Sequence, residues 1–195
     1  MHPATKGTLK LTDRALIGGV VFIVALLLGM EMAHAAEIIP AVGVSRNVDG
    51  GGSAKFYTAL SVRTSIIPMV KADLGVAYHS DEVNTGLFTT NATTWPVTLS
   101  AWLAPIPFVY AGGGIGWYHT SYSIPGGPSY AALATTNTSF GSHLGGGVQM
   151  PLVPMLSLDL NARYVMLKKD QNNSPLPSNY DPNFWSTSLG LAIKF

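Results

Sequence analysis

The chain has 195 residues, of which 47% are hydrophobic and 11% are charged, and its formal net charge at pH 7 is +1. Soluble domains carry about 25% charged residues, so charge is scarce here for a protein whose whole surface would meet water. The chain has no cysteine, which excludes a disulfide framework and a thiolate metal site.

The N-terminal segment is typical of a secretory signal peptide. Its first 14 residues include the basic Lys6, Lys10 and Arg14, an uncharged apolar run follows at 15–30, and Ala-His-Ala at 33–35 is a small-x-small cleavage pattern. We therefore expect cleavage after Ala35, which divides the chain into a signal-peptide helix at 1–35 and a mature domain at 36–195. The alternative is an uncleaved inner-membrane anchor, but the apolar run is shorter than the roughly 20 residues that a spanning helix needs.

The mature domain keeps eight basic and eight acidic residues and is formally neutral. A neutral chain without a basic stripe argues against a nucleic-acid partner. After residue 35 no apolar run approaches the length of a spanning helix. If the mature domain enters a membrane, it must do so as a closed sheet, because in lipid only helices and closed barrels satisfy every backbone polar group.

Alternating segments of about ten residues follow one another along the mature chain. In the clearest one, Leu158 and Leu160 alternate with Asp159 and Asn161, so one face of the strand is apolar and the other is polar. The eight segments lie at 38–46, 56–63, 70–79, 93–104, 107–120, 143–150, 156–166 and 185–195. An even count of eight is the usual minimum for a bacterial transmembrane barrel, so we predict an all-β, eight-stranded, antiparallel up-and-down barrel.

A soluble β-sandwich or lipocalin-like barrel would also alternate, but two features favour the membrane. The apolar side of the segments carries Leu, Ile, Val and aromatic residues, and the polar side carries small and charged residues. A soluble barrel would need that apolar set inside and would show many more charged residues on its outer side. The connections also alternate in length. Tight, proline-containing connections lie at 65–69, 104–107 and 151–154, and long polar connections lie at 80–92, 121–138 and 168–183. Short turns at one rim and long loops at the other are typical of outer-membrane barrels.

Aromatic residues gather near both predicted rims. Those near the long-loop rim are Tyr78, Trp95, Trp117, Tyr118, Tyr122, Tyr164, Phe184 and Trp185, and those near the short-turn rim are Phe108 and Phe195. Two such belts indicate a protein that spans a bilayer. Glycines are concentrated at 112–116 and 145–147. No helix is expected after these runs, which excludes a nucleotide-binding loop, and we expect inward glycines to leave room for large neighbours.

Four stretches then carry a resemblance to a known family. They are YAGGGIGW at 110–117, FGSHLGGGVQMP at 140–151, LSLDLNARYVML at 156–167 and DPNFWSTSLGLAIKF at 181–195. These stretches resemble small outer-membrane β-barrels of the porin-like superfamily that includes the OmpA barrel, OmpX and OmpW. The resemblance implies a monomer in the outer membrane of a Gram-negative bacterium, in contact with outer-membrane lipid and lipopolysaccharide. Among the terminal residues, it identifies Ser188, Gly190, Ile193 and Phe195 with the signal that the barrel assembly machinery reads.

The inward faces of the predicted strands collect polar and charged side chains. These are Arg63, Lys71, Asp73, His79, His143, Gln149, Asp159, Asn161, Arg163 and Lys194. Eight strands enclose a space just wide enough for side chains, so we expect a polar network that fills the lumen. The alternative is that the same residues line a narrow path for water or ions. We expect no metal and no cofactor.

Fold alone leaves three functions open. The first is a structural or surface-interaction barrel, the second a narrow pore or conduit for small solutes, as in OmpW-like proteins, and the third a lipid A-modifying enzyme. His119-Thr120-Ser121 resembles the His-x-Ser of outer-membrane lipid A deacylases. However, Tyr122 stands where an asparagine is expected, and the next acidic residue is Asp159. We therefore expect that the protein is not an enzyme.

Overall fold

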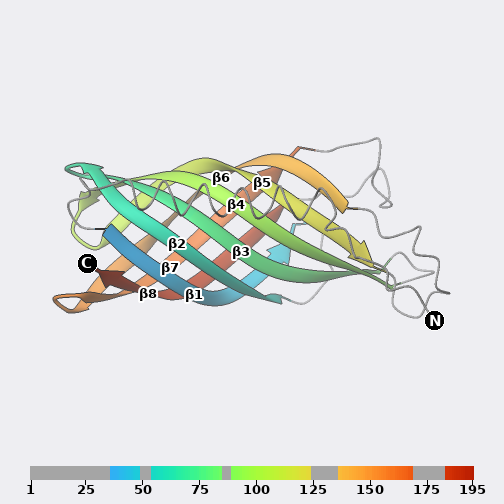
Figure 1. Cartoon of the computed structure of the whole chain (residues 1–195), viewed down its shortest axis with the longest axis horizontal. Coiled ribbons are helices and arrows are strands. Elements are labelled where there is room, and N and C mark those ends of the chain that lie inside the picture. Colours follow the sequence, from blue (N-terminus) through green and yellow to red (C-terminus); the bar gives the residue numbers. More distant parts are fainter. Residues whose placement is uncertain (1–35, 49–53, 85–88, 124–135, 169–182) are drawn as a thin grey trace, which may run out of the picture. The chain divides into compact units, whose positions relative to one another are not determined.

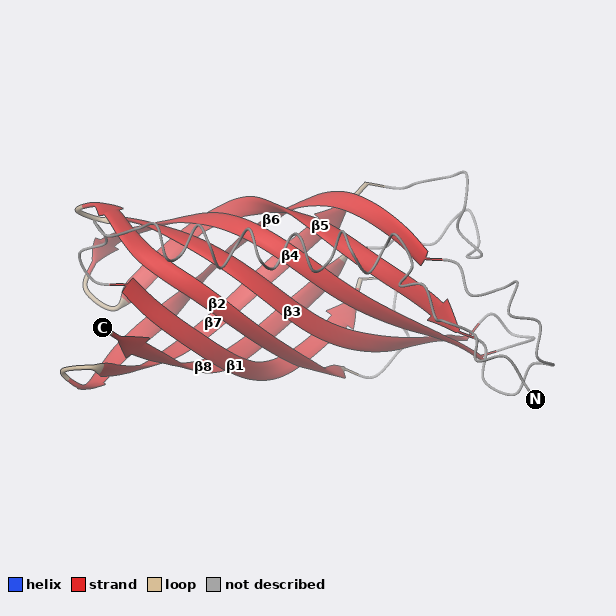
Figure 2. Ribbon diagram, viewed as in Figure 1, coloured by secondary structure: helices blue, strands red, loops and turns tan. Residues whose placement is uncertain are grey.

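The structure is a computed structural model that describes residues 36–48, 54–84, 89–123, 136–168 and 183–195. The predicted signal peptide and its cleavage site lie outside the described residues. Eight strands form one closed antiparallel barrel in sequence order, and β1 pairs with β8 (Figure 1, Figure 2). This confirms the predicted fold. No helix among the described residues is long and apolar enough to cross a membrane.

The strands are long and consecutive. Their bounds are β1 Ala36–Asn47, β2 Lys55–Ile67, β3 Val70–Asn84, β4 Thr89–Ile106, β5 Val109–Ser123, β6 Thr136–Val153, β7 Leu156–Leu167 and β8 Phe184–Lys194. Two residues connect β2 to β3, β4 to β5 and β6 to β7. The C-terminus lies at the same end as these short turns (Figure 1).

Two of the predicted long loops are shorter than expected. Residues 80–92 were predicted as a loop, but β3 continues to Asn84 and β4 begins at Thr89. The loop predicted at 121–138 is likewise shorter, because β5 continues to Ser123 and β6 begins at Thr136. The backbone ladder can continue wherever neighbouring strands remain paired, and threonine, which is frequent here, favours strands. The change to polar residues therefore shows where the apolar face of each strand ends, and the strands themselves extend beyond that point. The loop predicted at 168–183 agrees with the bounds of β7 and β8.

The two faces of the sheet have opposite polarity. Outward side chains such as Leu60 and Leu189 are each 47% exposed, although they are apolar. Inward side chains such as Arg63, Asp73 and Asp159 are at most 3% exposed, although they are charged. A soluble barrel would require the reverse arrangement, since water-exposed apolar area on this scale is unfavourable.

A girdle of outward aromatic rings surrounds the long-loop side of the barrel, joined in pairs across neighbouring strands. The ring centroids are 4.6 Å apart in Tyr78–Trp95, 5.8 Å in Trp117–Phe140 and 4.6 Å in Tyr164–Trp185. At the other rim, Phe108 and Phe195 are exposed.

The predicted belt was wrong for Tyr118 and Phe184. Both point inward and are buried, because each follows or precedes an outward tryptophan and successive strand residues face opposite sides. The side chain of Tyr122 lies outside the described residues.

Candidate functional site

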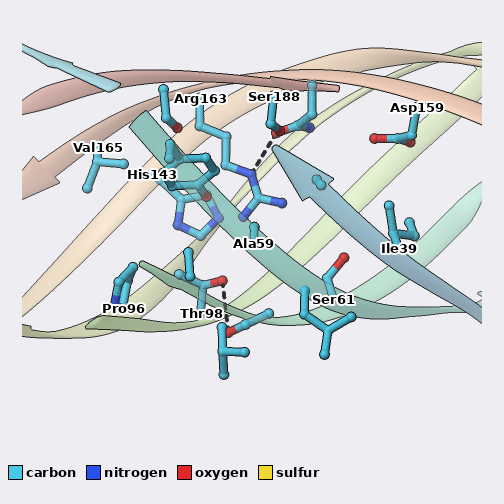
Figure 3. A pocket seen from close by; sticks show the side chains of 18 of the residues that line it. Ile39, Ala59, Ser61, Pro96, Thr98, His143, Asp159, Arg163, Val165 and Ser188 are labelled. Carbon is cyan, nitrogen blue, oxygen red and sulfur yellow. Dashed lines mark hydrogen bonds between the residues drawn. The ribbon is translucent and has the colours of Figure 1, made fainter. Parts of the chain in front are cut away.

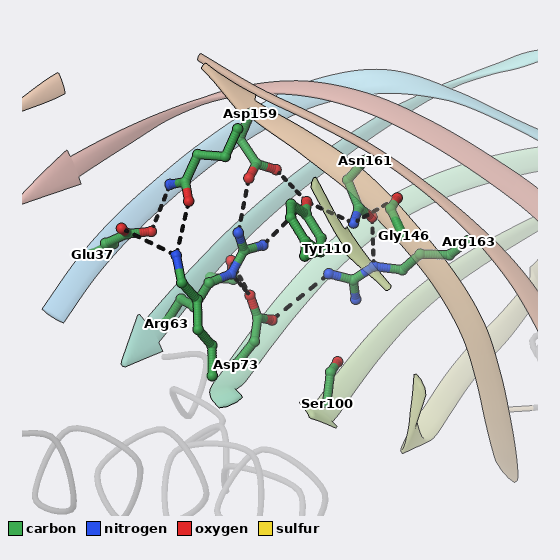
Figure 4. A network of polar contacts seen from close by, with 12 residues as sticks. Glu37, Arg63, Asp73, Ser100, Tyr110, Gly146, Asp159, Asn161 and Arg163 are labelled. Carbon is green, nitrogen blue, oxygen red and sulfur yellow. Dashed lines mark hydrogen bonds and ion pairs between the residues drawn. The ribbon is translucent and has the colours of Figure 1, made fainter. Parts of the chain in front are cut away.

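The centre of the lumen is occupied by one arginine that joins two carboxylates. Arg63 on β2 donates from Nε to Asp73 Oδ2 on β3 at 3.0 Å, and from Nη1 to Asp159 Oδ2 on β7 at 2.8 Å (Figure 4). The Ser61 hydroxyl donates to the same Asp73 oxygen at 3.2 Å. Burying charges costs free energy unless they are paired and hydrogen-bonded, and this arginine is paired on two sides. It therefore ties strands from different parts of the barrel wall together.

Tyr110 and Asn161 extend this central network. The Tyr110 hydroxyl donates to Asp159 Oδ1 at 2.8 Å and accepts from Asn161 Nδ2 at 3.0 Å. Arg163 Nε donates to Asn161 Oδ1 at 2.8 Å, and its Nη2 lies 3.7 Å from Asp73 Oδ1 (Figure 4). Each end of the network therefore returns to a carboxylate already bound by Arg63.

A glycine makes the position of Tyr110 possible. Gly147 on β6 lies opposite Tyr110 in the register of β5 and β6. A Cβ atom at Gly147 would collide with the Tyr110 hydroxyl oxygen and with the carbonyl oxygen of Leu160. The missing side chain gives the phenol room to reach Asp159, which is the role expected for the inward glycines.

A second polar cluster lies toward the short-turn end. Glu37, which is 5% exposed, accepts from Gln149 Nε2 at 2.7 Å. Lys71 Nζ donates to Gln149 Oε1 at 2.9 Å and lies 3.7 Å from Glu37 Oε1. Lys194 Nζ lies 3.9 Å from the same carboxylate oxygen. One carboxylate therefore balances two ammonium groups at this mouth of the barrel.

Sequence reasoning missed Glu37 and Tyr110. The first strand was predicted to start at residue 38, but Glu37 lies on β1, where inward and outward residues alternate. Tyr110 has the same parity as the inward glycines of β5, and that parity could have identified it. Both residues contact members of the predicted set and belong to the same polar clusters.

Aromatic side chains fill the lumen toward the long-loop end. The His79 and Phe184 ring centroids are 4.8 Å apart, those of Tyr118 and Phe184 are 6.1 Å apart, and those of Tyr57 and His79 are 6.4 Å apart. All four side chains are at most 7% exposed. This aromatic layer packs in the lumen beside the charged centre.

His143 and a small cavity lie among these inward side chains. His143 Nε2 and the Ser100 hydroxyl are 2.9 Å apart. A cavity of about 40 Å³ is lined by residues of both layers, among them Arg163, His143 and Tyr118 (Figure 3). This volume accommodates a few water molecules at most. Among the described residues, no group of three His, Cys, Asp or Glu side chains could hold a metal ion.

The residues predicted as the assembly signal lie on both faces of the end of β8. Ser188 is half-buried, Gly190 is buried, and both lie on the inward side, whereas Ile193 and Phe195 are 44% and 67% exposed on the outward side. The Phe195 backbone NH donates to the Ala36 carbonyl at 3.1 Å, where β8 meets β1. Phe195 therefore lies at the strand pair that closes the barrel.

In the His-x-Ser segment, the imidazole contacts a hydroxyl group on the neighbouring strand. His119 Nδ1 is 2.8 Å from the Thr138 hydroxyl on β6. His119 lies on the outward parity of β5, whereas Asp159 is bound inside the lumen by Arg63 and Tyr110. Asp159 is therefore on the wrong side of the sheet to orient this imidazole.

Comparison with known proteins supports the fold. A family model described as "outer membrane protein beta-barrel domain" matches residues 22–195. No curated protein matches the sequence. Among solved structures, Ail, the attachment invasion locus protein of Yersinia pestis, is 16% identical with a TM-score of 0.56, over 84% of this chain and 100% of that chain.

Two further solved structures are similar. Neisserial surface protein A is 15% identical with a TM-score of 0.54, over 83% of this chain and 96% of that chain. A major outer membrane protein of Thermus thermophilus is 18% identical with a TM-score of 0.52, over 83% of this chain and 100% of that chain. At these identities the likeness concerns the fold alone. The resemblance to small outer-membrane barrels that the sequence predicted is confirmed.

Proposed function

Because this chain belongs to the outer membrane protein β-barrel family, we propose that it is a structural or surface-interaction barrel whose lumen is closed by its own side chains. The observation that carries this proposal is the pairing of Arg63 with carboxylates on β3 and β7. The aromatic layer around Phe184 adds a second closure. With the centre filled in this way, the long-loop end is left as the part that meets partners outside the cell.

A narrow conduit is the second candidate. It is favoured by the cavity of about 40 Å³, which is lined in part by polar side chains such as Arg163 and His143. Opening such a path would require both the charged centre and the aromatic layer to rearrange. The two functions therefore differ in a measurable quantity, the conductance of the barrel.

Single-channel recording of the purified protein in planar bilayers tests this choice. We expect no unitary current steps from the wild type, and none from Phe184→Ala, since the charged centre still blocks the lumen. The variant that combines Phe184→Ala with Tyr118→Ala and Arg63→Ala should conduct, because it removes side chains from both layers. Regular steps from the wild-type protein would contradict the closed barrel and establish the conduit.

An activity on lipid A remains the third hypothesis, and the geometry around His119 gives it little support. Overproduction of the protein, followed by mass spectrometry of extracted lipid A, tests it directly. The closed-barrel proposal expects an unchanged lipid A mass. A loss of one acyl chain that disappears in Ser121→Ala would establish a deacylase.

We also propose the partners of assembly and of the membrane. Phe195 and Ile193 form an outward apolar end of β8, and we propose that the assembly machinery binds this end with Ser188 and Gly190. The outward apolar face and its aromatic girdle would then contact outer-membrane lipid and lipopolysaccharide. Neither proposal requires a nucleic acid, a cofactor or a second copy of the chain.

Deletion of Phe195 tests the assembly proposal. We expect a lower amount of folded, heat-modifiable protein in the outer membrane and an unchanged amount of protein secreted across the inner membrane. Phe195→Trp is the matched control, since it keeps an aromatic side chain at the terminus and should retain assembly. Unchanged folded protein after the deletion would show that Phe195 has no part in recognition.

A further inference from the structure

The three short turns of the barrel share one sequence pattern. Residues 67–70, 106–109 and 153–156 read Ile-Pro-Met-Val, Ile-Pro-Phe-Val and Val-Pro-Met-Leu. In each, an apolar residue and a proline precede a large apolar residue, and none of the twelve positions is charged or polar. Turns that face water usually carry Gly, Asn, Asp or Ser, so the composition of these turns calls for another environment.

The large residue in two of these turns occupies an unfavourable backbone conformation. Met69 has φ of 72° and Phe108 has φ of 75°. Proline followed by a residue of positive φ is the arrangement of a type II turn, in which glycine is preferred at the second position. A side chain at that position strains the backbone, because its Cβ atom comes too close to the following carbonyl oxygen. Met69 and Phe108 are nevertheless 60% and 55% exposed, so packing within the barrel does not explain them.

One backbone carbonyl in each turn is hydrogen-bonded within the protein. The carbonyls of Met69, Phe108 and Met155 each accept a backbone hydrogen bond from a neighbouring strand, which is β4, β6 and β8 respectively. The donors are the NH groups of Ala104 at 2.7 Å, Gln149 at 2.7 Å and Lys194 at 2.9 Å, in the same order. The prolines contribute no NH group at all. Each of these hydrogen bonds lowers the cost of placing the turn in lipid, where an unsatisfied backbone group is expensive.

The turns lie where the apolar band of the barrel ends. Phe108, which directly precedes β5, lies nine residues before Trp117 of the aromatic girdle. At about 3.3 Å per residue and a tilt of about 40°, this separation corresponds to roughly 23 Å along the membrane normal, close to the roughly 25 Å height of an apolar band. Outward residues beside the turns, such as Ile66 and Leu152, are 64% and 55% exposed and are also apolar. The lipid-facing surface therefore continues into the turns without a polar step.

We propose that the three short turns are immersed in the inner leaflet of the membrane, where Met69, Phe108 and Met155 anchor this end of the barrel among the acyl chains. Lys71, which lines the space beside two of the turns, and Lys194 both lie close to the Glu37 carboxylate at the mouth of the lumen. Lipid can thus surround the turns while water enters only at the mouth. The backbone strain at Met69 and Phe108 is retained because glycine would remove the anchoring side chain.

Site-directed spin labelling tests this proposal, and the absence of cysteine from the chain makes single labels simple to introduce. The protein is purified from outer membranes as Met69→Cys, Phe108→Cys and Met155→Cys and placed in vesicles of phosphatidylethanolamine and phosphatidylglycerol. Collision of the nitroxide with oxygen reports lipid, and collision with a water-soluble nickel chelate reports water. Leu160→Cys is the control for the lipid-facing band, and Lys168→Cys is the control for the exposed long-loop end.

We expect the three turn labels to collide with oxygen as the Leu160→Cys label does, and to be protected from nickel relative to the Lys168→Cys label. Nickel accessibility equal to that of the Lys168→Cys label would overturn the proposal. Protection from both reagents would also overturn it, because it would place the turns against protein. The heat-modifiable gel shift establishes that each variant is folded before it is measured.

A second variant separates anchoring from folding. Phe108→Gly relieves the positive φ and removes the ring, so the folded fraction in detergent micelles should be kept. In vesicles, where the ring must enter the leaflet, the folded fraction should fall. An equal folded fraction of Phe108→Gly and wild type in vesicles would contradict the anchor, whatever the conductance of the barrel.

Discussion

On β7, Asp159 and Leu160 are neighbours in sequence, yet Asp159 is 3% exposed and Leu160 is 46% exposed. The same contrast separates the polar clusters of the lumen from the outer face. The lumen buries its charges and satisfies them with one another, whereas the outer face exposes apolar side chains that only lipid can cover. The stability of the inward side therefore depends on specific partner side chains, and that of the outward side depends on the surrounding lipid.

This difference determines how each side responds to change. A lumen side chain is fixed by the groups that it binds, so its loss leaves those groups unpaired. An outward side chain has no particular partner, so apolar replacements are tolerated and charged ones are not. Substitutions confined to one side test this contrast.

The largest effect is expected inside the barrel. Arg63→Ala leaves Asp159 and Asp73 buried with their main cation removed, and breaking a buried ion pair costs about 3–5 kcal/mol. The measurement is the urea unfolding midpoint of the protein in micelles. The matched variant combines Arg63→Met with Asp73→Asn and Asp159→Asn, and should recover much of the loss because no charge is left unpaired. A loss below about 1 kcal/mol for Arg63→Ala would mean that water reaches the carboxylates.

The sequence predicted the barrel well because its strongest signal is alternation. Leu158 and Leu160 against Asp159 and Asn161 assign both faces of β7 without any knowledge of partners. The ends of the strands were harder to predict, because the ladder of β3 and β4 extends beyond the apolar band, to Asn84 and Thr89. The polarity of the side chains does not show where backbone pairing ends, so the predicted loop was too long.

The lumen was predicted as a set of residues and not as a set of bonds. Inward parity identified Arg63 and Asp159, but their contact joins positions 96 residues apart and depends on closure of the barrel. Tyr110 was missed because an inward tyrosine resembles a belt aromatic in sequence, and its role depends on the space left by Gly147. Contacts across a lumen require the register of every strand between them, which alternation does not specify.

The next effect is expected on the outer face. Leu160 lies between the girdle residue Tyr164 of the same strand and the turn residue Met155 that precedes it. Leu160→Arg should cost about 2–4 kcal/mol in lipid, because a charge in the bilayer core loses hydration and finds no partner. Leu160→Met keeps the apolar volume and should be close to wild type. The urea unfolding midpoint of the protein in vesicles measures this cost. Refolding of the wild type in buffer alone is a second measurement, and sheet structure that forms without detergent or lipid would contradict the lipid-facing assignment.

The smallest effect is expected in the aromatic girdle, where the outer face comes nearest to specific contacts of the kind found in the lumen. Tyr164 and Trp185 are cross-strand neighbours with ring centroids 4.6 Å apart and planes inclined at 47°. Such pairs contribute about 0.5–1.5 kcal/mol beyond the area that they bury. A double-mutant cycle of Tyr164→Leu and Trp185→Leu, followed by urea unfolding in micelles, should give a coupling energy in this range. A coupling energy indistinguishable from zero would show that these rings also depend on the interface alone, and the contrast between the two faces would then extend to the whole outer surface.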